Sequence, residues 1–169
     1  MYTPNMLSYR HAFHAGNHAD ILKHLTLTLI LDSLTKKEKP FTVFDTHAGA
    51  GLYDLNDSRL NQTEEAKKGI LKLLDIIQET EKIPEPLLKY IEICKLYKHE
   101  GLYTGSPEIE RCLMRNCDKL FISELHNTEV QVLEENIKSK PLYKKEQGYP
   151  SVFLRHEDGF SLLSSQLPP

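Results

Sequence analysis

Three short runs of apolar residues constrain the fold of this chain most, because an acidic residue follows each of them. The run "FTVFD" ends at Asp45, "KLFISE" ends at Glu124, and a polar turn containing Asp158 follows "SVFLR". Runs of this kind are typical of buried strands, and helix-like segments lie between them. Strands that alternate with helices predict an α/β fold with a parallel sheet. Ligands bind beyond the carboxyl ends of such strands, so we expect the three acids to converge on one site.

The segments between the runs predict the domain organisation. Apolar spacing and length favour a helix from about residue 19 to residue 37. Residues 56–101 contain two amphipathic segments, the second opening with two prolines, which indicates an inserted helical hairpin. We therefore predict a core of residues 1–55 and 102–169 with a small helical subdomain of residues 56–101 inserted into it.

Two later helices are predicted from the residues that would begin them. Ser106 has the residue type of an N-cap, and Pro107 suits the first helical position after it. Asn127 or Thr128 would cap the helix that follows the second strand.

The segment "THAGAGLYDL" follows the first strand as a turn and carries two glycines. Gly49 and Gly51 let the backbone approach a ligand closely, although a tight turn alone would also require glycine. The spacing departs from the dinucleotide pattern GxGxxG, because Asp54 stands in place of the third glycine. This argues against a nicotinamide-dependent oxidoreductase, which is one alternative. No Gly-Lys-Ser/Thr follows, so the loop favours a cofactor without phosphate.

The acids at the strand ends indicate an adenosine-containing ligand. Glu124 could accept hydrogen bonds from both hydroxyl groups of a ribose, although a solvated strand-end carboxylate is the alternative. Asp158 could accept a hydrogen bond from an adenine amino group, or it could cap the next helix. The two acids together with Asp45, at successive strand ends, favour the adenosine interpretation.

Histidines crowd the N-terminal region beside basic and aromatic residues. The set comprises Tyr9, Arg10, His11, His14, His18, Lys23 and His24. His11, His14 and His18 would share one face of any helix formed there. Neither a carboxylate nor a cysteine completes a familiar metal-ligand set, so we expect no metal. A structural cluster and a patch that contacts nucleic acid both remain open; in the second, cationic side chains would meet phosphates while Tyr9 or Phe13 stacks on a base.

Composition adds few constraints. The net charge of −3 does not indicate a nucleic-acid binder, although a local basic patch could still bind one. No apolar stretch approaches the roughly 20 residues of a membrane span, and the N-terminus lacks an apolar signal-type core. The three cysteines form no CxxC pair, which fits reduced cytoplasmic thiols. We expect a cytoplasmic protein with no membrane partner.

Several motifs in this order give the chain a specific resemblance. They are "MLSYRHAFHAGNHADILKH", "FDTHAGAGLYDL", "GSP", "SELH" and "EDGF". With them the chain resembles, from Met6 to its last residue, the RlmJ family of bacterial 23S ribosomal RNA adenine-N6 methyltransferases, whose members are also labelled as proteins for using external DNA. The resemblance implies a Rossmann-like methyltransferase fold with an inserted helical subdomain and S-adenosylmethionine as cofactor. It implies 23S ribosomal RNA, protein-free or partly assembled, as partner; we expect a monomer.

The resemblance and the residue chemistry together assign site residues. The family's motifs place His24, His47, Ser106, Glu124, Asp158 and Gly159 at the cofactor and Tyr9 at the RNA. Asp45, Gly49 and Gly51 join the cofactor site through the loop after the first strand. Arg10 and His11, beside Tyr9, are expected to contact RNA as well.

One departure from the family bears on activity. Adenine-N6 methyltransferases of this kind carry an Asp-Pro-Pro-Tyr motif after the fourth strand, and this chain has none. Its two final prolines follow Leu167 rather than an aspartate. We therefore expect a truncated chain that binds cofactor, holds no catalytic residue and is inactive by itself. The alternative is a non-catalytic nucleic-acid-binding protein on a methyltransferase fold, linked to the use of external DNA.

Overall fold

A parallel sheet of three strands organises the protein, as seen in a computed structural model that describes residues 13–78 and 82–167. The strands are β1 (Thr42–Asp45), β4 (Lys119–Ser123) and β5 (Ser151–Arg155), in the order β1-β4-β5. Because both pairings are parallel, the carboxyl ends of all three strands lie at one edge of the sheet. The predicted α/β fold with a parallel sheet is confirmed.

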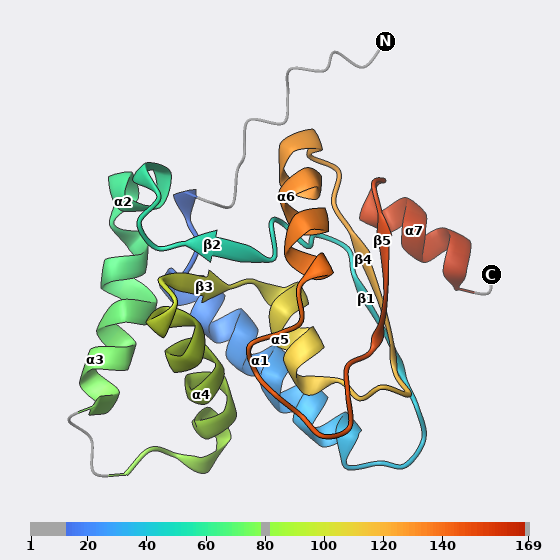
Figure 1. The fold of residues 1–169 in the computed structure, drawn as a ribbon, viewed down its shortest axis with the longest axis horizontal. Coiled ribbons are helices and arrows are strands. Elements are labelled where there is room, and N and C mark those ends of the chain that lie inside the picture. Colours follow the sequence, from blue (N-terminus) through green and yellow to red (C-terminus); the bar gives the residue numbers. More distant parts are fainter. Residues whose placement is uncertain (1–12, 79–81, 168–169) are drawn as a thin grey trace.

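Helices lie on both sides of this sheet (Figure 1). They are α1 (His18–Thr35), α5 (Ser106–Leu113), α6 (Asn127–Lys138) and α7 (Gly159–Gln166). Leu31 of α1 and Leu133 of α6 belong to a buried cluster with Leu120 and Ile122 of β4, so these helices cover one face. In Figure 1, α7 lies on the opposite side. The predicted first helix is confirmed, although it begins at His18 and ends at Thr35.

A second sheet, a two-stranded antiparallel ribbon, connects the core to the insertion. It consists of β2 (Leu52–Asp54) and β3 (Leu102–Thr104), with Tyr53 paired to Tyr103. The prediction that residues 52–54, which form β2, belong to a plain turn was wrong. Each strand has only three residues, and its partner is distant in the chain, so no local periodicity marks it.

The inserted helices lie between β2 and β3. They are α2 (Ser58–Thr63), the π-helical turn η2 (Lys67–Leu71), α3 (Lys72–Gln78) and α4 (Glu85–His99). Four apolar residues of the first predicted segment have helical spacing: Ile70, Leu74 and Ile77 are buried in one cluster, and Leu73 packs against it while partly buried. The helical nature predicted for this segment is therefore confirmed.

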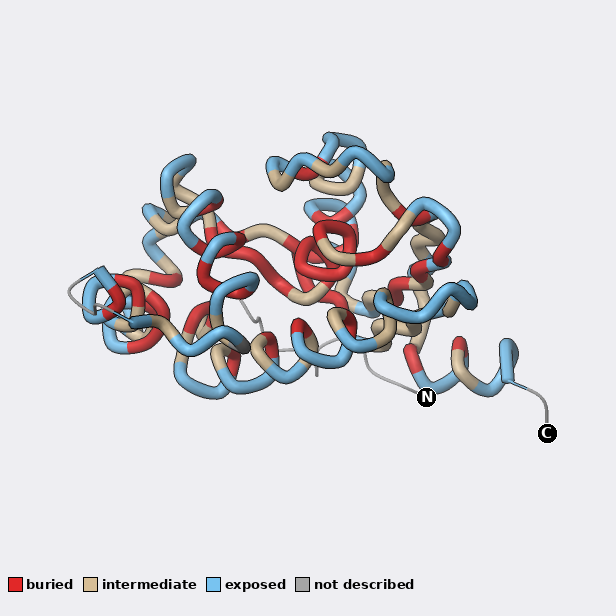
Figure 2. Tube along the Cα trace, turned by 90° about the horizontal axis from the view of Figure 1, so that it is seen from below, coloured by how far each residue is buried: buried red, intermediate tan, exposed pale blue. Residues whose placement is uncertain are grey.

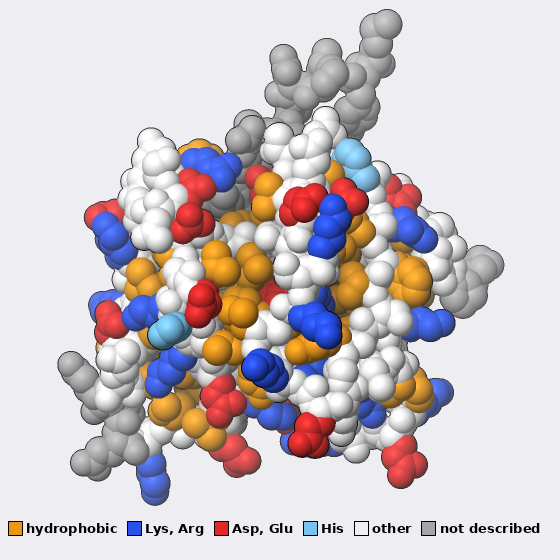
Figure 3. All heavy atoms as spheres, in the orientation of Figure 1, with side chains coloured by type: hydrophobic (Ala, Val, Ile, Leu, Met, Phe, Trp, Pro, Cys, Tyr) orange, Lys and Arg blue, Asp and Glu red, His pale blue; other side chains and the backbone are white. Residues whose placement is uncertain are grey.

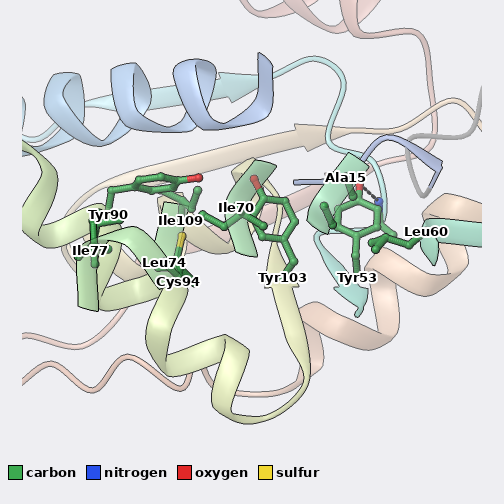
Figure 4. Close-up of a cluster of buried hydrophobic side chains, with 13 residues drawn as sticks. Ala15, Tyr53, Leu60, Ile70, Leu74, Ile77, Tyr90, Cys94, Tyr103 and Ile109 are labelled. Atoms are coloured by element: carbon green, nitrogen blue, oxygen red, sulfur yellow. Dashed lines mark hydrogen bonds between the residues drawn. The ribbon is translucent and has the colours of Figure 1, made fainter. Parts of the chain in front are cut away.

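The largest buried cluster joins the insertion to the rest of the protein. Figure 4 shows Tyr53, Tyr90 and Tyr103 lying along this cluster, which Ile109 of α5 also enters. In Figure 2 buried residues alternate with exposed ones along the helices and gather toward the middle of the molecule. The domain boundaries at residues 56 and 101 stay a prediction, because the shared cluster shows packing across them.

The surface has no single-sign charge field on the face drawn in Figure 3, where acidic and basic side chains intermix around hydrophobic ones. Across residues 13–78 and 82–167, none of the helices has both the length and the apolarity that a membrane crossing requires.

Candidate functional site

A cavity of about 500 Å³ lies at the carboxyl ends of the parallel strands. Loops after β1, β4 and β5 line it, together with the start of α1 and of α5. Seven of the predicted cofactor residues line this cavity: His24, His47, Gly49, Ser106, Glu124, Asp158 and Gly159. The structure thus brings together the ends of all three strands, as the sequence pattern indicated.

Glu124 ties the glycine loop to the start of α6. Its Oε2 accepts a hydrogen bond from the Gly49 backbone N–H at 2.8 Å, and its Oε1 accepts one from the His126 N–H at 2.7 Å. A carboxylate has about four acceptor positions, so two stay available for a ligand. The two backbone donors hold the carboxylate in one orientation before any ligand arrives.

The two loop glycines have different roles. Both take positive φ, 60° for Gly49 and 75° for Gly51, a region that favours glycine. Gly49 lines the cavity. Gly51 does not: its carbonyl accepts a hydrogen bond from the Gly105 N–H at 2.8 Å, and a Cβ there would lie 2.9 Å from Leu133. Gly51 therefore serves the close packing of the loop, and its cofactor role stays a prediction without a place in the cavity wall.

Asp45 supports the loop from behind the cavity wall. Its Oδ2 accepts a hydrogen bond from the Ser106 hydroxyl at 2.6 Å, and its Oδ1 accepts one from the His47 N–H at 3.1 Å. Burial raises the pKa of Asp45 above its ordinary value, while these two donors oppose the shift. The prediction that Ser106 is an N-cap was wrong: Gly105 takes that position, and the Ser106 hydroxyl donates to Asp45 instead.

A second carboxyl group, that of Glu110 on α5, is buried near Asp45. Glu110 is 2% exposed, its Oε2 has no hydrogen-bond partner within the described residues, and burial raises its pKa well above 4.5, with a further rise from the charge of Asp45. Folding therefore favours the protonated acid, which is a stabilisation lost as the pH rises from about 4.5 through the raised pKa.

We expect Glu110→Gln to remove this pH dependence. The wild type should lose up to about 1.4 kcal/mol of unfolding free energy per pH unit in that window, and the variant should lose clearly less. Urea unfolding from pH 5 to 8 measures the difference, with the exposed Glu134→Gln as control. Parallel pH curves for wild type and Glu110→Gln would contradict the assignment.

Asp158 combines the two roles that the sequence left open. It is the N-cap of α7, and its Oδ2 accepts hydrogen bonds from the Ser161 N–H at 2.9 Å and the Ser161 hydroxyl at 3.0 Å. The same residue lines the cavity beside Gly159. Capping therefore fixes the side chain at the cavity edge.

The histidines separate into different environments. His24 is buried, lines the cavity and lies 2.9 Å from the Tyr103 hydroxyl through Nδ1. His47 is exposed at the opening, with its ring 5.6 Å from that of Phe160. His14 does not line the cavity; it pairs with Glu65 at 2.9 Å. Because α1 begins only at His18, the predicted shared helical face with His14 was wrong.

Three predicted RNA-contacting residues, Tyr9, Arg10 and His11, lie outside the described residues. The cavity residues that the sequence reasoning missed include four with polar side chains: Asp20, Tyr53, His126 and Glu129. His126 also caps α6 by accepting from the Thr128 N–H at 3.3 Å, so the predicted caps at 127 or 128 were wrong. His126 lies two residues after the predicted strand-end acid Glu124, and this closeness in sequence was a signal for it. Asp20, Tyr53 and Glu129 reach the cavity through tertiary contacts that the sequence does not show.

Comparison with known proteins gives the family. The family model described as ribosomal RNA large subunit methyltransferase D, RlmJ, matches residues 38–169. The chain belongs to the RlmJ family. This confirms the resemblance found in the sequence motifs.

Relatives of this chain include two curated proteins named ribosomal RNA large subunit methyltransferase J. The one from Escherichia coli K12 is 40% identical over 167 residues, and the one from Haemophilus influenzae Rd is 38% identical over 168 residues. Each match covers 97% of this chain and 55% of the relative, so the chain spans about half the length of these relatives. A crystal structure of a Legionella pneumophila protein matches with a TM-score of 0.75 and 38% identity, over 92% of this chain and 54% of that one.

Proposed function

We propose that this chain binds S-adenosylmethionine for methyl transfer to the N6 amino group of an adenine in 23S ribosomal RNA. The observation that carries the proposal is the strand-end carboxylate of Glu124, held by the Gly49 N–H and facing the cavity. An acid at this point of a parallel sheet is placed to accept hydrogen bonds from ribose hydroxyl groups. The names of the relatives support the reaction class.

The residues present fit this cofactor. The cavity of about 500 Å³ is within the range of small-molecule sites. Its wall offers Glu124 to a ribose, Asp158 to an adenine amino group, and His24 and His47 near the remaining part. When bound, the cofactor would supply an electrophilic methyl group. No step here requires a metal.

The chain's own residues would contribute by positioning. The amino group of adenine is a weak nucleophile, because its lone pair is delocalised into the ring, so the base must be captured and aligned. Alignment of reacting groups supplies much of the rate in such reactions. Glu124, with the Gly49 loop, would fix the cofactor, while Tyr9, Arg10 and His11 would contact the RNA. That the chain by itself lacks methyl transfer stays a prediction.

Titration of the chain with S-adenosylhomocysteine tests this proposal. We expect Glu124→Ala to weaken binding roughly 10- to 150-fold, because a hydrogen bond to a charged group contributes about 1.5–3 kcal/mol. Isothermal calorimetry measures the affinity, and Glu134→Ala, an exposed carboxylate change on α6, serves as control. Thermal melting of both variants checks that they fold. Equal affinity of wild type and Glu124→Ala would refute the ribose role, and no binding to the wild type would refute the cofactor.

A further inference from the structure

Four carboxylates at the strand ends and the cavity already have hydrogen-bond donors. Asp45 binds the Ser106 hydroxyl, Glu124 binds two backbone N–H groups, and Asp158 caps α7. Asp20 accepts from the Gly16 N–H at 3.0 Å and pairs with the Lys23 ammonium at 2.9 Å. Each of these side chains thus has a structural role in the protein itself.

Glu129 differs from these four. It lies in the first turn of α6, is only 6% exposed and lines the cavity. Over residues 13–78 and 82–167, no group donates a hydrogen bond to its carboxylate and no cation pairs with it. An acid at this helical position can bond back to the N–H of the N-cap. That N–H, on His126, is already donated to Glu124.

A buried carboxylate without a partner calls for a cation. Removing a charge from water is unfavourable unless an opposite charge and hydrogen bonds compensate for it. Arg59 is near enough to Glu129 for the charge of this carboxylate to contribute to the raised pKa of Arg59. The guanidinium of Arg59 donates to Asp57, however, and this hydrogen bond is the larger cause of the raised pKa. Glu129 therefore stays free to bind a cationic group that enters the cavity.

The sheet order shows which part of the proposed cofactor would reach Glu129. Asp158 follows β5 at one side of the sheet, and Glu124 follows the middle strand β4. Glu129 lines the cavity together with Tyr53 of β2, the strand that follows the loop after β1, and β1 lies on the other side of β4 from β5. With adenine at Asp158 and ribose at Glu124, the amino-acid end of the cofactor points to the side of Glu129.

We propose that Glu129 binds the ammonium group of the cofactor's amino-acid end. The inference rests on the proposed function and adds the residue that recognises this end. The ammonium supplies the positive charge and the hydrogen-bond donors that the carboxylate lacks. Glu129 is thus a specificity residue for an amino-acid-bearing nucleoside over a plain nucleoside.

A thermodynamic cycle with two ligands tests the assignment. The ligands are S-adenosylhomocysteine and its des-amino analogue, which keeps the carboxylate and lacks the ammonium. Calorimetry measures both affinities for wild type, Glu129→Gln and the control Glu134→Gln. We expect Glu129→Gln to weaken the binding of S-adenosylhomocysteine roughly 10- to 150-fold. The binding of the des-amino ligand should weaken by less than about twofold, because the two changes remove the same contact and are therefore not additive. The control should bind both ligands like the wild type.

The outcomes separate this inference from the proposed function. If the wild type binds neither ligand, the cofactor proposal fails as a whole. If the wild type binds S-adenosylhomocysteine and Glu129→Gln binds it equally well, only the Glu129 assignment is overturned. Equal weakening of both ligands would also overturn it, because the side chain would then serve the nucleoside or the fold. The wild type alone gives a check that is independent of variant folding: it should prefer the amino-bearing ligand by the same factor.

Discussion

Arg111→Ala should destabilise the protein by about 3–5 kcal/mol, the range measured when one partner of a buried ion pair is removed. Arg111 is 5% exposed and donates to the Glu108 Oε2 at 2.7 Å. Its guanidinium also donates to three backbone carbonyls, those of Asn136, Ile137 and Ser139, at the end of α6. Alanine would leave these carbonyls without the guanidinium donor and the buried Glu108 carboxylate without its cation.

The loss should depend on pH with a definite sign. Burial raises the pKa of Glu108, while the charge of Arg111 and the Tyr97 hydroxyl oppose the rise. Without Arg111 the folded-state pKa of Glu108 rises further, so protonation relieves the buried charge at lower pH. The deficit of Arg111→Ala relative to wild type should therefore be smaller at pH 5 than at pH 8.

Urea unfolding at both pH values measures this prediction. Arg155→Ala is the matched control, because Arg155 is exposed and its guanidinium donates to a neighbouring carbonyl. The control should stay within about 0.5 kcal/mol of wild type. A deficit below about 1 kcal/mol in Arg111→Ala, or one that grows at low pH, would show that the pair does not stabilise the fold as we describe.

Gly159→Ala has the second large expected effect. A Cβ at Gly159 would lie 2.2 Å from the Thr46 carbonyl oxygen and 2.7 Å from the Thr46 Cα. Both are backbone atoms of the loop after β1, so they cannot move aside as a flexible side chain could. Overpacking of this kind destabilises by 1–3 kcal/mol, and we expect about 3 kcal/mol here. The backbone shift that relieves this clash should also displace Asp158 and weaken the binding of S-adenosylhomocysteine.

Helix propensity predicts the opposite result for this substitution. Gly159 is the first residue of α7, and alanine is favoured over glycine in helices by about 0.8–1.0 kcal/mol. The control Ser164→Ala lies on the exposed side of the same helix and should be nearly neutral. Urea unfolding shows whether Gly159→Ala loses stability through overpacking or gains it through helix propensity, and calorimetry measures its affinity for S-adenosylhomocysteine. A Gly159→Ala protein as stable as wild type would show that α7 can move without loss.

Much of the fold was predictable because its signals are local. Short apolar runs predict two of the strands, the one ending at Asp45 and the one ending before Glu124. The length of its segment predicts α1 as a helix. The glycine loop was recognised because positive φ at Gly49 favours one residue type. Family motifs then identified six further residues that do line the cavity.

The roles within the site depended on contacts between distant parts of the chain. Ser106 has the local signature of a cap, yet its hydroxyl donates to Asp45, 61 residues away. Gly51 looks like Gly49 in sequence, but only Gly49 reaches the cavity. The local sequence around Ser106 and around the two glycines does not contain the packing geometry that decides these roles.

The sequence by itself therefore determined the fold class, the family and the acids at the strand ends, because period, residue type and motif order are properties of the chain alone. Only the tertiary structure decided which carboxylates already have donors and that Glu129 has none within residues 13–78 and 82–167. A hydrogen bond requires two groups within about 3 Å, and in this protein the Gly49 N–H and the Glu124 carboxylate, 75 residues apart, become neighbours only when the sheet assembles.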